Sequence, residues 1–160
     1  MLRVILFLSI LFFVTSCTQK SASISKQQAD VVTDSVNTMM KYIAQDITTS
    51  GTAAWLKYFE NSPAFFMASD GNLVFPSHDM AEYYINKNLK KSISKIGLQW
   101  GDIKIDPLTS QYANIAATFH EDITDESGAS VPLNGFFTGI AHQSDGGWQL
   151  HNAHWSVSSN

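Results

Sequence analysis

Three polar side chains share one face of the last segment of the chain, where they could bind or react with a small molecule. In residues 147–156, strict alternation places Asn152, His154 and Ser156 on the face that begins with Trp148 and Leu150. Side chains two apart in a strand share a face. The pattern therefore predicts a strand that starts in a hydrophobic core and ends at the wall of a cavity.

His154 is the best candidate for acid or base chemistry, because an imidazole titrates near neutral pH and a cavity can shift it further. As a catalyst, His154 would remove a proton while Tyr42 or Asn152 stabilises the developing oxyanion. As a binding residue, it would only hydrogen-bond a ligand. The sequence pairs no carboxylate with His154. We therefore favour the binding interpretation.

The five histidines do not have the spacing of a metal site. His151 and His154 fall on one predicted strand at an odd separation, which sends them to opposite faces. His78 precedes a helix, and His120 and His142 lie on different strands. With one cysteine in the chain and no His-x-His pair on a strand, we predict no metal site and no cofactor.

The single cysteine, Cys17, follows an N-terminal pattern typical of secretion. Met1-Leu2-Arg3 supplies a positive charge, residues 4–14 are almost wholly apolar, and small residues precede Cys17. Residues 14–17 resemble the lipobox of bacterial lipoproteins, in which the chain is cut before a cysteine that then carries acyl chains. The alternative is an ordinary secreted protein whose cysteine happens to fall at this position.

These observations predict three parts of the chain and a location in the cell. Residues 1–16 would be a lipoprotein signal peptide, residues 17–23 a lipidated Cys17 with a polar tether, and residues 24–160 one domain. The lipidated Cys17 would anchor the protein to a membrane of the bacterial cell envelope, facing the periplasm or the cell surface.

The composition supports a folded domain and argues against a nucleic-acid partner. Hydrophobic residues make up 44% and aromatic residues 12% of the chain, enough to build a core. The formal charge is −4 at pH 7, and the basic residues do not cluster beyond Lys90-Lys91. A nucleic-acid-binding surface would need such a cluster.

Hydrophobic periodicity predicts helices first and strands afterwards. Helical spacing covers residues 24–47, 52–59 and 79–96, with a short hairpin around Asp70-Gly71 between the last two. Four extended segments follow, at residues 98–108, 112–124, 131–143 and 148–158. The order predicts an α+β fold in which three N-terminal helices pack in the concave face of a curved, mainly antiparallel sheet.

This order of elements, with a Gly-Trp strand that ends in His-Trp-Ser, resembles the nuclear-transport-factor-2-like superfamily, whose cone-shaped fold is also called SnoaL-like. The resemblance covers residues 24–158. The superfamily includes ketosteroid isomerases, dehydratases, polyketide cyclases and members that only bind ligands or proteins. Fold alone therefore implies no reaction.

Comparison with the ketosteroid isomerases gives a set of residues to examine. The segment Lys41-Tyr42-Ile43-Ala44 resembles the one that holds their oxyanion-stabilising tyrosine, which implies that role for Tyr42. Their catalytic base falls at Ala68 and their acid at Gly139, so steroid isomerase chemistry is not expected. The pocket residues implied by the resemblance are Tyr42, Ala68, Phe137, Gly139, Asn152, His154 and Ser156.

Two neighbouring strands complete the predicted cone. On the strand before the last, Phe137, Gly139 and Ala141 would face inward, and the small residues would enlarge the space beside His154. On residues 112–124, apolar burial favours the inward set Ala113, Ile115, Ala117 and Phe119, with His120 outside or at the rim.

Trp155 falls on the opposite face from His154 by the same alternation. An exposed tryptophan on a sheet often marks an interface. We therefore expect a homodimer formed through the outer sheet face, including Trp155. Packing of Trp155 beneath the tether or a loop is the alternative.

The sequence favours a lipid-anchored domain that binds a small, largely apolar ligand without catalysis. One alternative is a cofactor-free isomerase, dehydratase or cyclase that uses His154 and Tyr42. The other is a protein-interaction module that uses the outer sheet face.

Overall fold

The computed structural model describes residues 24–158. The predicted signal peptide, Cys17 and the tether lie outside these residues. Within residues 24–158, none of the helices combines the length and the apolar character needed to span a membrane.

The first helix, α1 (Lys26–Ser50), begins at a capping box and ends at a glycine. The Ser25 hydroxyl accepts a hydrogen bond from the Gln28 backbone N–H (3.3 Å), and the Gln28 side chain accepts one from the Ser25 N–H (3.2 Å). Gly51, at φ 78°, stops the helix in a conformation that suits glycine. One face of α1 is buried and consists of Val32, Val36, Met39, Met40, Ile43 and Ile47.

Two short strands follow a short 3-10 helix. The 3-10 helix η1 (Thr52–Lys57) leads to β1 (Phe66–Ser69) and β2 (Asn72–Phe75), which form the expected hairpin. Its turn residues Asp70 (φ 47°) and Gly71 (φ 81°) both adopt the left-handed conformation that tight hairpin turns require.

The remaining helical residues form one segment of three elements, α2 (His78–Tyr84), η2 (Ile85–Leu89) and α3 (Lys90–Ser92). The prediction extended this helix to Ile96, but it ends at Ser92. Ile93 and Ile96 instead begin the next strand, where the side chain of Ile96 is buried in the core.

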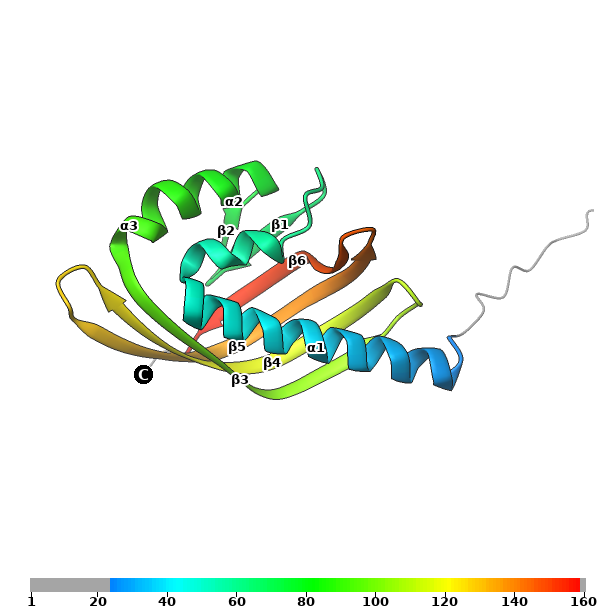
Figure 1. Cartoon of the computed structure of the whole chain (residues 1–160). Coiled ribbons are helices and arrows are strands. Elements are labelled where there is room, and N and C mark those ends of the chain that lie inside the picture. The colour runs from blue at the N-terminus through cyan, green and yellow to red at the C-terminus, as the bar shows by residue number, and fades with distance from the viewer. Residues whose placement is uncertain (1–23, 159–160) are drawn as a thin grey trace, which may run out of the picture.

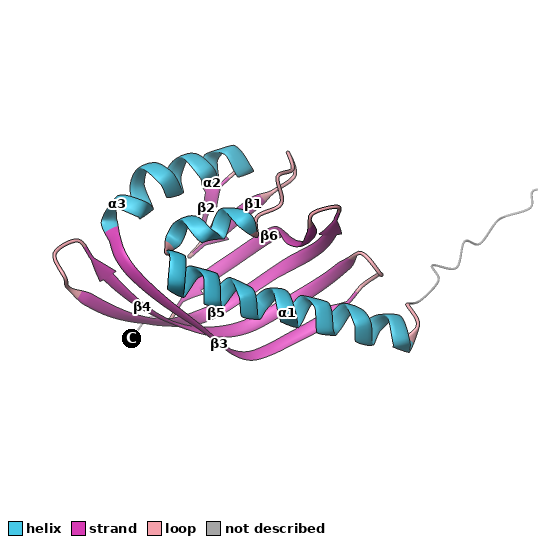
Figure 2. Ribbon diagram, viewed as in Figure 1, coloured by secondary structure: helices cyan, strands magenta, loops and turns pink. Residues whose placement is uncertain are grey.

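The sheet contains the hairpin and four longer strands, β3 (Ile93–Pro107), β4 (Tyr112–Asp125), β5 (Ser130–Ser144) and β6 (Gly147–Val157). Its order is β2-β1-β6-β5-β4-β3, and every neighbouring pair is antiparallel except β1 with β6. Figure 1 and Figure 2 show the curved sheet wrapped around α1, with the α2–α3 segment beside β1 and β2. The predicted α+β architecture is confirmed.

The inner faces of β4 and β5 are those that the sequence predicts. Ala113, Ile115, Ala117 and Phe119 of β4 are buried, as are Phe137, Gly139 and Ala141 of β5. His120 lies on the other face, partly exposed.

The inner face of β6 differs from the prediction, because the strand contains a β-bulge. Ile140 pairs with Asn152, but the next residue, Ala141, pairs with Leu150. His151 is therefore an extra residue, and it shifts the alternation by one position. Buried side chains continue from Leu150 to Ala153 and Trp155.

The bulge places Trp155 in the core and His154 outside, which reverses the prediction for both residues. Trp155 is only 8% exposed, and its ring packs against an aromatic cluster made of Trp55, Trp100, Phe119 and Phe137. Trp155 therefore cannot contribute to an interface on the outer sheet face.

Candidate functional site

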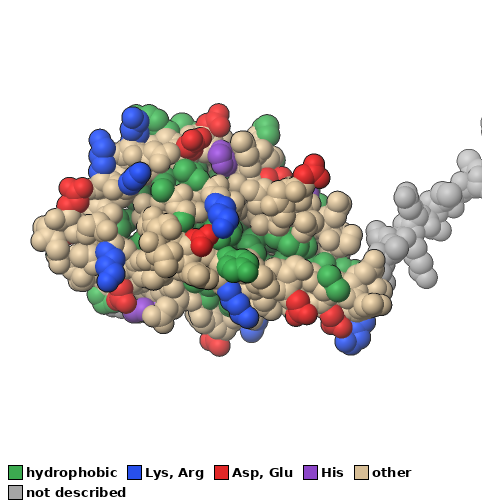
Figure 3. Space-filling view, in the orientation of Figure 1, with side chains coloured by type: hydrophobic (Ala, Val, Ile, Leu, Met, Phe, Trp, Pro, Cys, Tyr) green, Lys and Arg blue, Asp and Glu red, His purple; other side chains and the backbone are tan. Residues whose placement is uncertain are grey.

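A cavity of about 290 Å³ lies between the hairpin β1–β2, the helical elements η1 and η2, and the adjoining ends of β3 and β4. Its walls are mainly aromatic and aliphatic. They consist of Thr52, Trp55, Phe59, Met67, Ser69, Val74, Phe75, Tyr84, Ile85, Leu89, Ile93, Ile96, Glu121, Ile123 and Trp155. We call this the cone cavity. Figure 3 shows hydrophobic side chains reaching the surface between charged ones on the face that carries α1 and the α2–α3 segment.

Glu121 is the only ionisable carboxyl among the residues that line the cone cavity. It continues the inner face of β4 beyond Phe119, two residues further along the strand, and only 6% of it is exposed. Burial raises the pKa of the Glu121 carboxyl to about 7. Within residues 24–158, no side chain or backbone group makes a hydrogen bond to this carboxyl.

The chemistry of the cone cavity follows from this single acid. Near neutral pH the carboxyl is divided between its neutral and charged forms. The neutral form donates a hydrogen bond and the carboxylate accepts one or takes a proton. Thr52, Ser69 and Tyr84 supply hydroxyl groups to the same walls.

The polar residues predicted on β6 do not line the cone cavity. The Asn152 side chain accepts a hydrogen bond from the Ile140 N–H (3.3 Å), and the Ser156 hydroxyl donates one to the Phe136 carbonyl (3.2 Å). His154 is exposed and pairs with Ala68 of β1 and Thr138 of β5. The prediction that these side chains face the cavity is wrong, because the bulge at His151 reverses their face.

Ala68, Phe137 and Gly139 do not line it either. Ala68 faces away from its neighbours Met67 and Ser69, which do line the cavity. Phe137 is buried in the aromatic cluster. A Cβ atom on Gly139 would lie 3.1 Å from the Phe137 ring and 2.8 Å from the Asn152 carbonyl. The space beside Gly139 is therefore filled by protein.

Tyr42 lies in a separate surface groove. It projects from α1, is 54% exposed, and shares the groove with Lys57, Tyr58 and Trp148. Because α1 packs on the concave face and His154 is on the outer face, the structure does not bring Tyr42 and His154 together.

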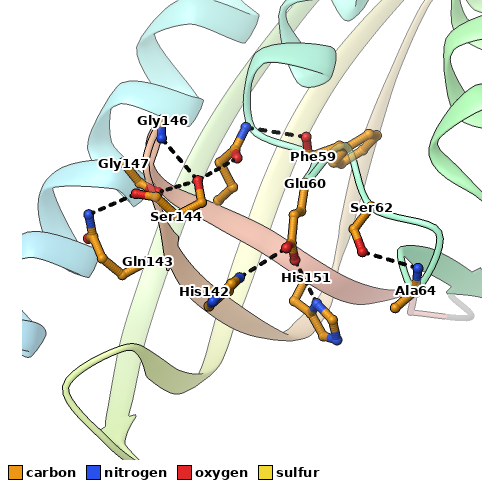
Figure 4. A network of polar contacts seen from close by, with 11 residues as sticks. Phe59, Glu60, Ser62, Ala64, His142, Gln143, Ser144, Gly146, Gly147 and His151 are labelled. Atoms are coloured by element: carbon orange, nitrogen blue, oxygen red, sulfur yellow. Dashed lines mark hydrogen bonds and ion pairs between the residues drawn. The ribbon is translucent and has the colours of Figure 1, made fainter.

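A second polar group lies outside the cone cavity and joins three segments of the chain (Figure 4). The Glu60 carboxyl contacts Nδ1 of His142 through Oε1 (3.0 Å) and Nδ1 of His151 through Oε2 (2.6 Å). The side chains are largely buried, with exposed fractions of 13%, 20% and 26% for Glu60, His142 and His151. We call these residues the Glu60 cluster.

Two effects oppose each other on the Glu60 carboxyl. Burial raises its pKa, but hydrogen bonds from His151 and His142 outweigh burial and lower the pKa overall. The Tyr112 ring stacks on His142 with centroids 4.3 Å apart and fixes that imidazole. Two imidazole nitrogens and a carboxylate, all within 4.8 Å of one another, are a set that could hold a metal ion.

The sequence pattern could have identified Glu121 as a candidate site residue, but not the Glu60 cluster. Glu121 follows the predicted inward set of β4 at the same period of two, and a carboxyl at the end of an apolar face is a candidate pocket acid. The Glu60 cluster has no local signal, because its members are up to 91 residues apart.

Comparisons with known proteins support the fold. No family model matches the chain, and no curated protein matches its sequence. A nuclear-transport-factor-2-like superfamily protein from Salmonella enterica is 15% identical, with a TM-score of 0.65 over 84% of this chain and 93% of that one. A provisionally named scytalone dehydratase from Novosphingobium aromaticivorans is 11% identical, with a TM-score of 0.72 over 84% and 89%.

A third similar structure is a hexachlorocyclohexane dehydrochlorinase, LinA-type3, from Novosphingobium barchaimii, which is 8% identical with a TM-score of 0.68 over 84% of this chain and 92% of that one. Identities this low establish the architecture alone. The chain has the nuclear-transport-factor-2-like fold, as the resemblance in its sequence implied.

Proposed function

We propose that this protein is a lipid-anchored domain of the bacterial cell envelope that binds a small, largely apolar molecule in its cone cavity. The observation that carries the proposal is an apolar cavity of about 290 Å³ with a single buried carboxyl, Glu121, that has no protein partner among residues 24–158. Pockets for small molecules combine apolar walls with a few polar groups that set orientation.

The cavity limits the chemistry of the ligand. Its volume is at the lower end of the range of about 300–1,000 Å³ for ligand pockets, so a compact molecule fits it. Its aromatic walls favour an apolar body, and Glu121 favours one hydroxyl, amine or carbonyl group on that body. The Glu121 carboxyl has no hydrogen-bond partner among the described residues, so a polar group on the ligand would give it one.

The anchor in this proposal is Cys17, supported by the sequence of residues 1–17 alone. Acyl chains on Cys17 would hold the domain at a membrane of the cell envelope, since two or more chains anchor stably where one is marginal. The ligand would then be bound outside the cytoplasm.

A second candidate function is proton transfer by Glu121. A carboxyl with a pKa of about 7 suits general acid or base chemistry at neutral pH. Two proteins of similar structure are named as a dehydratase and a dehydrochlorinase, and both names describe eliminations. A cofactor-free elimination or isomerisation would therefore depend on Glu121, in place of His154 and Tyr42.

Native mass spectrometry of the full chain, purified from its source, tests the proposal. We expect a bound small molecule in the wild type and in His154→Phe, which alters the outer face. Ser69→Leu, which fills the cone cavity, should lose that molecule. Equal occupancy in Ser69→Leu would place the ligand elsewhere. Retention of the molecule in Glu121→Gln, with loss of its conversion to a product, would favour the enzyme.

The same spectra report the anchor and the oligomeric state. An intact mass that includes acyl chains on Cys17 would support lipidation, and an unmodified N-terminus would overturn it. A homodimer through the outer sheet face also remains a proposal. Its support is now Phe66 and Phe136, which are 43% and 46% exposed on that face. A purely monomeric species at high concentration would contradict it.

A further inference from the structure

We propose that the Glu60 cluster binds a divalent transition-metal ion, with zinc as the best fit. Glu60, His142 and His151 come from three separate segments, and Nδ1 of each histidine contacts one of the two carboxylate oxygens of Glu60 (Figure 4). The candidate ligand atoms lie within 4.8 Å of one another. None of the three side chains lines the cone cavity. The inference is therefore independent of the proposed function.

The backbone around the Glu60 cluster is built to hold these side chains in place. The Glu60 N–H donates to the Leu150 carbonyl (2.9 Å), and the Leu150 N–H donates to the Tyr58 carbonyl (2.7 Å). These bonds attach the segment before Glu60 to β6 directly beside the bulge. The bulge turns His151 toward Glu60, and bulges often direct a side chain to a functional position.

The imidazole of His142 is fixed from another side. Its ring is nearly parallel to that of Tyr112, at an interplanar angle of 8°. A rigid ligand loses little conformational entropy when it binds an ion. The three ligands are therefore preorganised by a backbone ladder, a bulge and a stacked ring.

The ligand types select the class of ion. Two imidazole nitrogens and one carboxylate oxygen suit zinc and its first-row neighbours, whereas calcium and magnesium prefer oxygen ligands. The ion would replace the two hydrogen bonds that now join Glu60 to the histidines. Tetrahedral zinc ligands at about 2.0–2.2 Å from the ion lie roughly 3.3 Å apart. The candidate ligand atoms lie within 4.8 Å of one another, so closing any pair around an ion takes a movement of at most about 1.5 Å.

The partial exposure of the histidines leaves room for a fourth ligand. His151 and His142 are 26% and 20% exposed, so a water molecule can reach an ion held between them. Three protein ligands and a water are the arrangement of an open zinc site, in contrast to closed structural sites with four protein ligands.

Isothermal titration of the full chain with zinc chloride tests the inference. The chain should carry Cys17→Ser, which removes its only thiol, should lack a histidine tag, and should first be stripped with EDTA. We expect one zinc per chain and much weaker binding of calcium or magnesium. Loss of outer-sphere partners already weakens metal binding by roughly 10–100-fold, so His151→Gln should weaken it by about 100-fold or more.

Two further variants keep the result interpretable. His154→Gln changes an exposed histidine on the same strand and should bind zinc like the parent. His142→Gln should lose binding as His151→Gln does, which guards against a folding defect in one variant. Cobalt(II) should also give the visible absorption of a tetrahedral site in the parent and in His154→Gln, and in neither His142→Gln nor His151→Gln. Unchanged zinc affinity in both His142→Gln and His151→Gln, or no binding in the parent, would overturn the proposal.

Discussion

Glu60 and Glu121 are both largely buried, yet their pKa values move in opposite directions. Glu121 lies in an apolar cavity without a hydrogen-bond partner among the described residues, and burial raises its pKa to about 7. Glu60 accepts hydrogen bonds from His151 and His142, and its pKa is lowered in spite of burial. Both are held beside the same aromatic core, since Phe59, the neighbour of Glu60, lines the cone cavity.

The difference shows that the partners of a buried carboxyl, more than its burial, decide what it can do. Glu60 has its hydrogen bonds supplied by the protein, so it stabilises the native fold. In the proposed metal site, bonds to the ion would replace these hydrogen bonds. Glu121 has bonds to gain from a ligand. The same substitution, Glu to Gln, should therefore have opposite effects at the two positions.

The largest expected effect is a gain in stability of Glu121→Gln at high pH. A native pKa of about 7 against an ordinary 4.5 means that the folded state holds a proton more tightly than the unfolded state. Native stability from this group is greatest below pH 4.5 and falls as the pH rises to 7. Above pH 7, Glu121→Gln should be more stable than the wild type by about 3 kcal/mol.

Urea unfolding at pH 5 and pH 8 measures this gain. The difference between variant and wild type should be small at pH 5 and large at pH 8. Glu126→Gln, in the exposed turn after β4, is the matched control and should show no such dependence. An equal difference at both pH values would mean that Glu121 titrates normally in the folded state.

A smaller effect of opposite sign is expected for Glu60→Gln. The amide can accept from one histidine but presents N–H groups to the other, so about 1–3 kcal/mol of stability should be lost at pH 7. The native pKa of Glu60 is lowered from its ordinary value of 4.5. Its contribution to stability is therefore fully present above pH 4.5 and is lost as the pH falls through the lowered native pKa. The deficit of the variant should therefore shrink in acid.

The measurement is again urea unfolding, after EDTA treatment so that metal binding does not contribute. Glu82→Gln, exposed on α2, serves as the control. A variant as stable as the wild type at pH 7 would show that the two histidine contacts contribute nothing to the fold.

The sequence predicts most of this fold because its strands keep a regular alternation. The inner faces of β4 and β5 follow from Ala113 to Phe119 and from Phe137 to Ala141, where every second side chain is buried. Continuing the β4 alternation by two residues reaches Glu121. The raised pKa was not predictable, since it depends on side chains from η1, β1 and η2 that close the cavity around this carboxyl.

The regular alternation of β6 is broken at His151, and the residues that follow it face the opposite side from the one predicted. A bulge changes the pairing of a strand without a distinct residue type to mark it, and His151 is an ordinary strand residue by sequence. The extra residue exchanges the faces of His154 and Trp155. It also turns His151 toward Glu60, a contact across 91 positions of the chain that no local pattern encodes.

The smallest expected effect is at His154, and it separates the outer face from both glutamate regions. His154 is exposed and belongs neither to the cone cavity nor to the Glu60 cluster. His154→Phe should therefore change the free energy of unfolding by less than about 0.5 kcal/mol. The same substitution at His151 removes a hydrogen bond to the Glu60 carboxylate and should cost about 1–3 kcal/mol. Urea unfolding of both variants at pH 7 measures the two free-energy changes. The expected order follows from the bulge, which places His154 outside and turns His151 toward Glu60. If His154→Phe were the more destabilising change, the final strand would have the simple alternation that the sequence predicts, with His154 inside the cone.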